Sequence, residues 1–529
     1  MQIQQINREE AGIFSSQHVR IVHKQQEMEK YVQRLFSEEM FAHQLEAKQF
    51  EFKQEKREVL VQALKKQYAS ITEDRPDFDR LLSPNAFTVT TGHQLTLLAG
   101  PMYFVVKILE VIKLAKQLTE KYPSSDIIPV FWMASEDHDF EEIQSTTLFN
   151  RKLTVDYEQR GPVGRFSLEK LEAFKAEILD FFGEDKRDEI GPLLDAYSGT
   201  NLTEATRNLV HHLFGDKGLM IVDGDDVALK GLFAPIVKEE LIAGKSEGAV
   251  LKTNESLEKE GFKLQVHPRP INLFYIENGV RERIKRTETG FEAGEKSWSE
   301  QELLDLVDSN PIHFSPNVIL RPVYQETILP NLAYIGGAGE ISYWLQLKGV
   351  FELYETVYPI IQVRNSVLWV DKTSIKKMDK IGLDWKEVFK DTDILKKEYV
   401  QEHSSDALDF SKLDEMASNL SKEIEERALS VDTNMKQFAA SEVTRLQKQL
   451  DGLKAKLIKA SKGKHDQAMK SIEVVKDKLF PGGGLQERSA NFLSFCADGV
   501  VQSRLDSLYE ALDPFSENLI VLLETDSTK

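Results

Sequence analysis

Short apolar runs alternate with amphipathic, helix-like stretches between residues 86 and 363. The runs fall at residues 86–90, 127–134, 218–222, 271–276, 317–320, 332–336 and 358–363. Runs of this length, separated by helical patterns, are typical of an α/β domain with a mostly parallel sheet. Residues 160–310 add helical patterns, many charges and a hairpin pattern at 273–279. We interpret this region as insertions between strands of the sheet.

The segments on either side of this region have a helical pattern. Residues 24–70 lack Gly and Pro and are rich in Glu, Gln, Lys and Leu, which predicts long helix. Leu446, Leu450, Leu453 and Leu457 recur at the seam spacing of a coiled coil. Breaks near 430–432 and 461–463 predict helices that fold back on each other, and such an arm must pack on itself or on a second chain. We divide the chain into a core (1–374), an arm (375–480) and a C-terminal segment (481–529) that returns to the core.

Composition narrows the classes of function. The chain has 529 residues and a formal net charge of −19, which argues against nucleic acid as a partner. The single cysteine, Cys496, cannot form an internal disulfide, which favours a reducing compartment. The start lacks a secretory pattern, and no apolar segment approaches the roughly 20 residues that span a bilayer. We expect a cytoplasmic protein without a membrane partner.

The first candidate motif follows the predicted strand at 86–90 and precedes an apolar helix over 102–118. Its glycines allow close approach of a ligand, and a helix amino terminus suits a phosphate or carboxylate. Alternatively, the glycines only shape a loop and the lysine is a solvated surface charge. We favour a ligand site because a histidine, a glutamine and two glycines occur together after a strand. Its residues are Gly92, His93, Gln94, Gly100, Tyr103 and Lys107.

The second candidate motif is the charged end of the strand at 127–134. Carboxylates beside an imidazole can perform acid–base chemistry, hold a substrate ammonium group or bind a metal. The metal signal is weak because no second histidine lies at helical spacing. Helix capping by Ser135 is the structural alternative, and it is compatible with function. The predicted catalytic residues are Glu136, Asp137, His138 and Asp139, together with Lys107.

Further polar residues follow later predicted strands. Arg321 can grip a carboxylate or phosphate in bidentate fashion. The glycine-rich turn at 336–340 is not a dinucleotide fingerprint, because its spacing departs from G-x-G-x-x-G. As a third loop at the same edge of the sheet, it fits a nucleotide or sugar site. Alternatively, its glycines only shape a structural turn. Arg269, Asn272 and the aspartates at 223, 225 and 226 are weaker signals that surface positions would also explain. The predicted binding residues in this group are Arg269, Asn272, Arg321, Gln325, Gly336, Gly337 and Glu340.

Taken together and in this order, the motifs resemble the BshC family from about residue 12 to the C-terminus. No single motif is specific, but the combination is. The matching segments are 91–94 with 100–101, 129–132 with 136–139, 314–317 with 320–322, 336–340 with 343–344, and 479–481 with 485–488. Many members of the family have Gln at the position of His93, which argues against an essential role for the imidazole itself.

The resemblance implies a ligase that adds L-cysteine to the amino group of glucosaminyl malate in bacillithiol synthesis. It also implies a Rossmann-like core related to nucleotidyl transferases, connective insertions, a coiled-coil arm and a homodimer. Activation of the cysteine carboxylate makes ATP or another nucleotide an expectation, while a metal requirement stays open. Two alternatives remain, namely a coiled-coil scaffold protein and another nucleotidyl or glycosyl transferase on the same fold.

Overall fold

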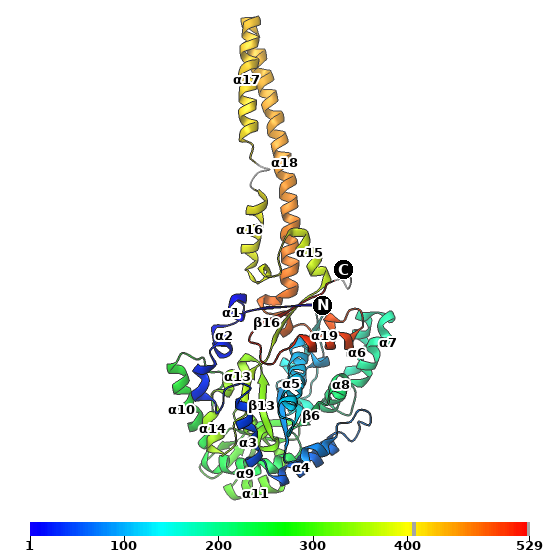
Figure 1. The fold of residues 1–529 in the computed structure, drawn as a ribbon, viewed down its shortest axis with the longest axis vertical. Helices are drawn as coiled ribbons and strands as arrows, with labels where there is room; N and C mark the ends of the chain where they lie inside the picture. The colour runs from blue at the N-terminus through cyan, green and yellow to red at the C-terminus, as the bar shows by residue number, and fades with distance from the viewer. Residues whose placement is uncertain (405–408, 526–529) are drawn as a thin grey trace. The chain divides into compact units, whose positions relative to one another are not determined.

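The computed structural model describes residues 1–404 and 409–525 (Figure 1). They divide into two compact units. Of these, residues 1–369 and 484–525 form the first unit, and residues 370–404 and 409–483 form the second. The second unit is therefore inserted into the first, near the boundaries expected at 375 and 481.

A five-stranded sheet lies at the centre of the first unit. Every pairing in it is parallel, and its strands are buried along almost their whole length. Continuous apolar runs such as those in this chain are what a parallel sheet covered on both faces requires. The predicted α/β, Rossmann-like fold is confirmed. The strand order is β14 (Ile360–Val363), β13 (Asn331–Gly336), β2 (Ala86–His93), β3 (Asp126–Met133) and β6 (Met220–Asp223).

The order of the strands creates a crevice. From β2 the chain passes through helix α5 (Met102–Lys121) to β3 and then to β6, and it later returns to β13 on the other side of β2. Ligands bind outside the carboxyl ends of the strands at such a reversal. Helix α5 packs against β2 and β3 and is buried around most of its circumference.

The N-terminal region differs from the prediction of one long helix over residues 24–70. The chain turns between 32 and 39 and again at Phe52, where Val32, Phe36 and Phe52 are buried. Burying these side chains requires bends, and packing overrides helix propensity. The observed elements are α1 (Arg8–Ala11), α2 (Ser16–His23), a 3-10 helix (Gln25–Tyr31), α3 (Met40–Glu51) and α4 (Gln54–Gln67).

The region between β3 and β13 contains insertions, as predicted. The predicted hairpin forms from β7 (Leu273–Glu277) and β8 (Val280–Arg283), and both turn residues, Asn278 and Gly279, have positive φ. Strand β7 belongs to a separate antiparallel sheet with β12 (Phe314–Pro316). The other elements are β4 (Ser145–Leu148), β5 (Arg151–Thr154), α6 (Leu171–Phe182), α7 (Arg187–Ala196), α8 (Leu202–Phe214), α9 (Val227–Ala243), α10 (Lys245–Lys259), β9 (Lys285–Arg286), β10 (Phe291–Ala293), β11 (Lys296–Trp298) and α11 (Glu300–Ser309).

The strand predicted at residues 317–320 is wrong. These residues form a turn in which the Asn317 side chain accepts hydrogen bonds from the backbone N–H groups of Ile319 and Leu320. Helix α12 (Arg321–Ile328) begins directly afterwards. Arg321 therefore stands in the first turn of a helix and not at the end of a strand.

The C-terminal segment completes the first unit. Strand β16 (Leu519–Leu523) lies between β1 (Gln2–Ile6) and β15 (Ser366–Val370) in a second small sheet. Glu487 accepts the backbone N–H of Val367 and pairs with Arg364, so this segment is bound to the chain directly after β14. The remaining helices of this unit are α13 (Ala338–Trp344), α14 (Lys348–Leu353) and α19 (Val501–Ala511).

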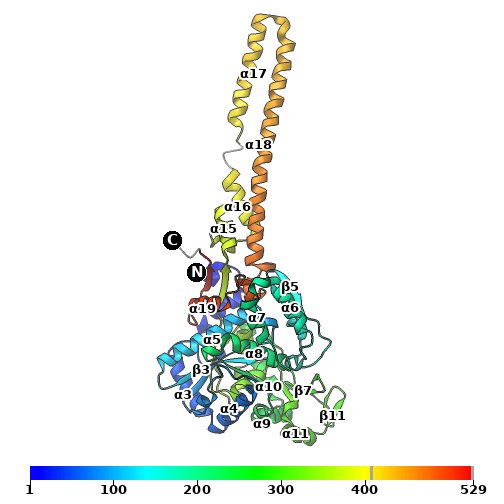
Figure 2. The same ribbon diagram turned by 90° about the vertical axis from the view of Figure 1, so that its right-hand side faces the viewer.

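The second unit is helical. Helices α17 (Ser411–Val431) and α18 (Lys436–Leu479) lie side by side as an antiparallel hairpin (Figures 1 and 2). The break expected near 430–432 is confirmed, but the one near 461–463 is wrong because α18 continues through it. One glycine in a helix lowers its stability by only about 1 kcal/mol relative to alanine, and the surrounding residues have high helix propensity, so the helix continues. Helices α15 (Lys372–Ile381) and α16 (Thr392–Ser404) complete the unit.

Candidate active site

A pocket of about 740 Å³ opens at the carboxyl ends of β2, β3 and β13. It is lined by residues that follow each of these strands, by the first turns of α5 and α12, and by the β7–β8 hairpin. Eleven of the predicted site residues line it. They are Gly92, His93, Gln94, Tyr103, Lys107, Glu136, Asp137, Arg269, Arg321, Gly337 and Glu340.

The remaining predicted residues take other positions. Gly100 and Asn272 are buried outside the pocket wall, Gln325 lies behind it, and the Gly336 carbonyl accepts the N–H of Arg364. His138 and Asp139 are exposed. These six residues are not among those that line the pocket.

An ion pair between Lys107 and Glu340 joins α5 to the segment after β13. The Lys107 Nζ atom lies 2.7 Å from Glu340 Oε2 and 2.5 Å from the Gly92 carbonyl, and its side chain is 2% exposed. Burial lowers the pKa of Lys107, although the Glu340 charge opposes this shift. Burial acts to raise the pKa of Glu340, but the Lys107 charge and hydrogen bonds outweigh it, so that pKa lies below the usual value. The alternative that Lys107 is a solvated surface charge is therefore wrong, because the side chain is buried and paired.

His93 is held in one neutral form. Its Nδ1 atom lies 3.0 Å from the Gln94 carbonyl, which can only accept, so Nδ1 carries the proton. Nε2 then accepts from the Tyr103 hydroxyl at 3.0 Å. Burial, followed by the charge of Lys107, lowers the pKa of His93 to about 4. At neutral pH this imidazole is neutral, and its role here is to orient Tyr103.

The acidic residues after β3 are connected to the loop after β2. The Gln94 Nε2 atom donates to Asp137 and to Glu142, at 2.7 Å in each case. The other Asp137 oxygen accepts the backbone N–H of His138 at 2.8 Å. Both oxygens of Asp137 are thus engaged. The two loops form one hydrogen-bonded wall of the pocket.

Arg321 lies among aromatic rings. Its guanidinium carbon is 5.8 Å from the ring centre of Tyr334 and 6.0 Å from those of Trp132 and Trp344. Its Nη1 atom donates to Gln325 at 3.0 Å. Gln325 therefore positions Arg321, because the two residues are one helical turn apart on α12.

The surroundings of three further predicted features are defined by packing contacts. At the α5 amino terminus, where an anion was expected, the N–H of Met102 donates to the Ala490 carbonyl at 2.8 Å. A side chain at Gly100 would meet the Asn491 Nδ2 atom at 2.3 Å, so this glycine is needed for packing. Asn272 accepts from the Asn317 side chain at 2.8 Å and supports the pocket from behind.

Glu136 is held by a buried cluster of charged side chains, for which the sequence contained only weak signals. The Lys230 Nζ atom lies 2.7 Å from Glu136 and 2.9 Å from Asp225, and Arg165 forms a bidentate pair with Asp225. Burial and then the Asp225 charge raise the pKa of the adjacent Asp223 to about 6. Asp223 and Asp225, weak signals in the sequence, thus belong to the support of the site.

The pocket is rich in cations although the chain is acidic. Its lining includes seven Lys and Arg side chains and four Asp and Glu side chains. Arg364 is paired with Glu487, whereas Arg269, Arg283 and Arg488 are exposed. Such a lining favours a ligand that carries negative charge.

Comparison with known proteins now identifies the family. Residues 1–365 match the model "Bacillithiol biosynthesis BshC, N-terminal Rossmann-like domain", and residues 367–524 match "Bacillithiol biosynthesis BshC, C-terminal coiled-coil domain". The chain belongs to the BshC family. It is accordingly an enzyme of the ligase class, with the Rossmann-like core and coiled-coil arm that were expected.

Curated relatives in this family match over nearly their full length. Three of these relatives share the name "Putative cysteine ligase BshC". The relative from Flavobacterium psychrophilum is 39% identical over 98% of each chain. Those from Flavobacterium johnsoniae and Cytophaga hutchinsonii are each 38% identical, over 92% and 88% of each chain.

Several pocket residues of this BshC-family chain escaped prediction. Arg281 and Arg283 come from the hairpin, Arg364 follows β14, and Arg488 comes from the C-terminal segment. Arg488 stands in the segment 485–488 that carried the family resemblance, which is the one signal that pointed to it. Arg364 directly follows the predicted strand at 358–363, so the signal of a polar residue at a strand end could have found it. Arg281 and Arg283 stand in an ordinary charged stretch, so only the fold brings them to the pocket.

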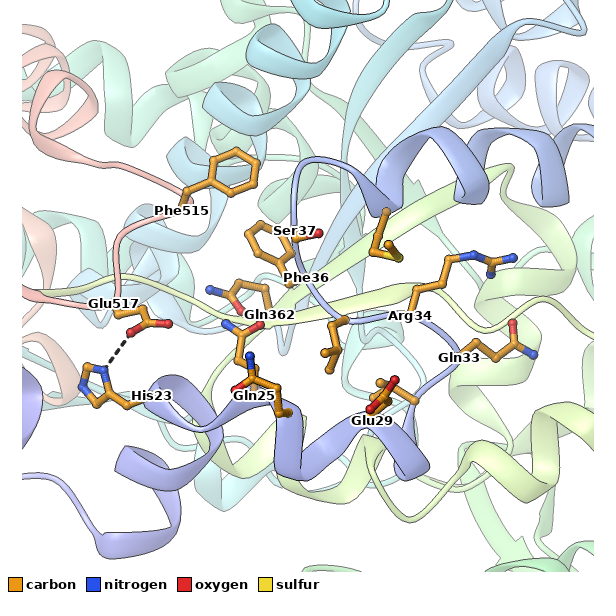
Figure 3. A pocket seen from close by; sticks show the side chains of 14 residues that line it. His23, Gln25, Glu29, Gln33, Arg34, Phe36, Ser37, Gln362, Phe515 and Glu517 are labelled. Atoms are coloured by element: carbon orange, nitrogen blue, oxygen red, sulfur yellow. Dashed lines mark hydrogen bonds and ion pairs between the residues drawn. The ribbon is translucent and has the colours of Figure 1, made fainter.

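A second pocket, of about 520 Å³, lies beside the N-terminal helices (Figure 3). Residues between His23 and Met40 line it together with Gln362, Phe515 and Glu517. His23 Nδ1 pairs with Glu517 at 2.9 Å across its edge. None of the predicted site residues lies among its lining residues.

Neither a metal cluster nor a membrane span is found in the described part of the chain. Within residues 1–404 and 409–525, no three His, Cys, Asp or Glu side chains are placed to hold a metal ion. Among the same residues, no helix is both long and apolar enough to cross a bilayer.

Proposed function

We propose that this chain joins the carboxylate of L-cysteine to the amino group of glucosaminyl malate. The supporting observation is a pocket that contains both kinds of charge in different places. The carboxylates of Glu136 and Asp137 follow β3, while Lys107, Arg321 and Arg364 lie toward β13 and β14. Each substrate carries an amino group and at least one carboxylate, so such a pocket complements both of them.

Amide formation in water requires an activated carboxylate, for which we propose an acyl-adenylate, a mixed anhydride that forms when the cysteine carboxylate attacks the α-phosphorus of ATP and pyrophosphate leaves. The sugar ammonium first passes one proton to a carboxylate of the pocket. The free amine then attacks the activated carbonyl carbon, the C–N bond forms, the bond to AMP breaks, and the second proton of the nitrogen passes to solvent. Arginines at the pocket, such as Arg321 and Arg488, would offset the charge of the leaving group.

The reactive thiol in this proposal belongs to the substrate. Cys496 is completely buried. Burial raises the pKa of its thiol well above the usual value. A thiol in this state is a poor nucleophile, which is consistent with a protein that uses cysteine as a substrate and not as a catalytic group.

The test is a direct assay of the purified chain. L-cysteine, glucosaminyl malate and ATP are mixed with the protein, and mass spectrometry follows the appearance of bacillithiol. Reactions without one component, and with L-serine in place of cysteine, are the controls. A strain from which the gene is deleted should lack bacillithiol and accumulate glucosaminyl malate. Normal bacillithiol in that strain would refute the proposal.

We also propose that the arm forms a homodimer. Leu446, Leu453 and Leu457 follow the coiled-coil spacing but are 40%, 50% and 43% exposed within one chain. Covering these leucines with a second arm would remove apolar surface from water. Light scattering should give twice the chain mass, and replacing the three leucines with lysine should give the monomer. An unchanged mass for that variant would refute this interface.

A further inference from the structure

Lys230 is a buried lysine that faces the pocket from behind. It lies in the first turn of α9, and its side chain is 2% exposed. Its Nζ atom contacts three oxygens, namely Glu136 Oε1 at 2.7 Å, Asp225 Oδ1 at 2.9 Å and the Ile312 carbonyl at 3.0 Å. Two of these contacts are hydrogen bonds, to Asp225 and to the Ile312 carbonyl, and the contact with Glu136 is an ion pair.

The charges around Lys230 are balanced within the fold. Asp225 is held by Lys230 and also by Arg165, whose Nε and Nη2 atoms donate to it at 2.8 and 2.9 Å. Buried charges are stable only when they are paired in this way. Two cations and two carboxylates thus form a compact group, and Glu136 is its only member that lines the pocket.

Glu136 differs from the other acidic residues of the pocket. Glu340 is neutralised by Lys107, and Asp137 has a hydrogen bond to each oxygen. Glu142 accepts from Gln94 through Oε2, and its side chain is exposed to solvent, unlike that of Glu136. For Glu136, the contact with Lys230 occupies Oε1 on the side away from solvent, and the side chain is still 13% exposed. In Glu136, therefore, Lys230 fixes one carboxylate oxygen, and the other oxygen is left to bind a ligand.

We propose that Glu136 binds the ammonium group of the amine substrate, and that Lys230 is a positioning residue that keeps the Glu136 carboxylate turned into the pocket. The identity of the ligand, glucosaminyl malate, rests on the function proposed above. The sugar amine is assigned to this place because it must lose a proton during amide formation, whereas the ammonium group of cysteine does not.

The test measures binding of glucosaminyl malate and of its N-acetyl derivative, which has no ammonium group, by calorimetry. Glu136→Gln and Lys230→Met should each weaken binding of the amine roughly 10- to 100-fold, the value of a charge-assisted hydrogen bond. Binding of the N-acetyl derivative should change less than about threefold. The double variant should bind the amine no more weakly than Glu136→Gln alone, because Lys230 acts through Glu136.

Two further variants separate positioning from folding. Lys230→Arg keeps the charge and should retain most of the amine affinity. Lys238→Met, on the same helix, removes a lysine that pairs with Asp308 at the surface and should change nothing. If Lys230→Met does not fold, Glu136→Gln with the two ligands still decides the role of Glu136, and Lys230→Arg decides that of Lys230.

Several results would overturn the inference. Equal loss for both ligands would make the cluster merely structural, and additive losses in the double variant would show that Lys230 acts independently. Unchanged amine binding in Glu136→Gln, or no binding by the wild type, would also exclude it. Failure of the proposed function looks different, because the wild type would bind glucosaminyl malate with the predicted pattern but form no bacillithiol with cysteine and ATP.

Discussion

Glu110 offers a sharp test of the electrostatics beneath the site. It lies on α5 and is completely buried. One oxygen accepts the backbone N–H of Asn365 at 2.7 Å, and the other makes no hydrogen bond. Burial raises the pKa of Glu110 to about 8, although that hydrogen bond and the charge of Arg364 oppose the shift. At pH 7 the carboxyl group is therefore protonated in the folded protein and ionised in the unfolded chain.

The sign of the pH dependence follows from this difference. The folded state binds one more proton between the unfolded pKa of about 4.3 and the folded pKa. The free energy of unfolding thus falls with rising pH by about 1.4 kcal/mol per unit in that window. Glu110→Gln removes the titration and keeps an oxygen for the Asn365 N–H. Relative to the wild type, the variant should gain roughly 3 kcal/mol of stability between pH 5.5 and 7.5.

Urea unfolding at pH 5.5, 6.5 and 7.5, followed by tryptophan fluorescence, measures this difference. Other buried carboxyl groups titrate in both proteins, so subtracting the two curves isolates Glu110. Glu120→Gln, an exposed position on the same helix, is the matched control and should leave the pH dependence unchanged. Parallel curves for the wild type and Glu110→Gln would refute the reasoning.

Three further predictions concern the pocket. His93→Gln should keep kcat/KM for bacillithiol formation within about threefold, since a neutral imidazole supplies only one donor and one acceptor; a loss above 100-fold would restore a catalytic role. Arg321→Lys should lower kcat/KM roughly 10- to 100-fold, because lysine cannot reproduce the planar fork held by Gln325; full activity would contradict this. Gly100→Ala should destabilise the protein by about 1–3 kcal/mol through the clash with Asn491, and an unchanged urea midpoint would exclude that clash.

Much of the candidate site was visible in the sequence for a physical reason. Strands buried on both faces must be continuously apolar, so the polar residues that end them stand out. This applied to Gly92, His93 and Gln94 at the end of β2 and to Glu136 and Asp137 after β3, all of which line the pocket. Parallel strands end at one edge of a sheet, so these residues had to meet.

Other features lay beyond such patterns. The N-terminal helix prediction was wrong because helix propensity contains no information on which faces the core covers. The strand at 317–320 was wrong because a short apolar run can also be the buried turn before a helix, where Asn317 supplies the hydrogen bonds. Gly100 has a packing role that depends on Asn491, almost 400 positions away in the chain.

The sequence by itself determined the α/β class, the strands of the central sheet, the helical arm and the family, because each depends on local periodicity or on ordered motifs. Tertiary structure alone decided how the charges are paired. Lys107 became a buried partner of Glu340, and Lys230 came to support Glu136 across 94 positions of sequence. Pairing depends on distance in space and on burial, and neither quantity can be read from the order of residues along the chain.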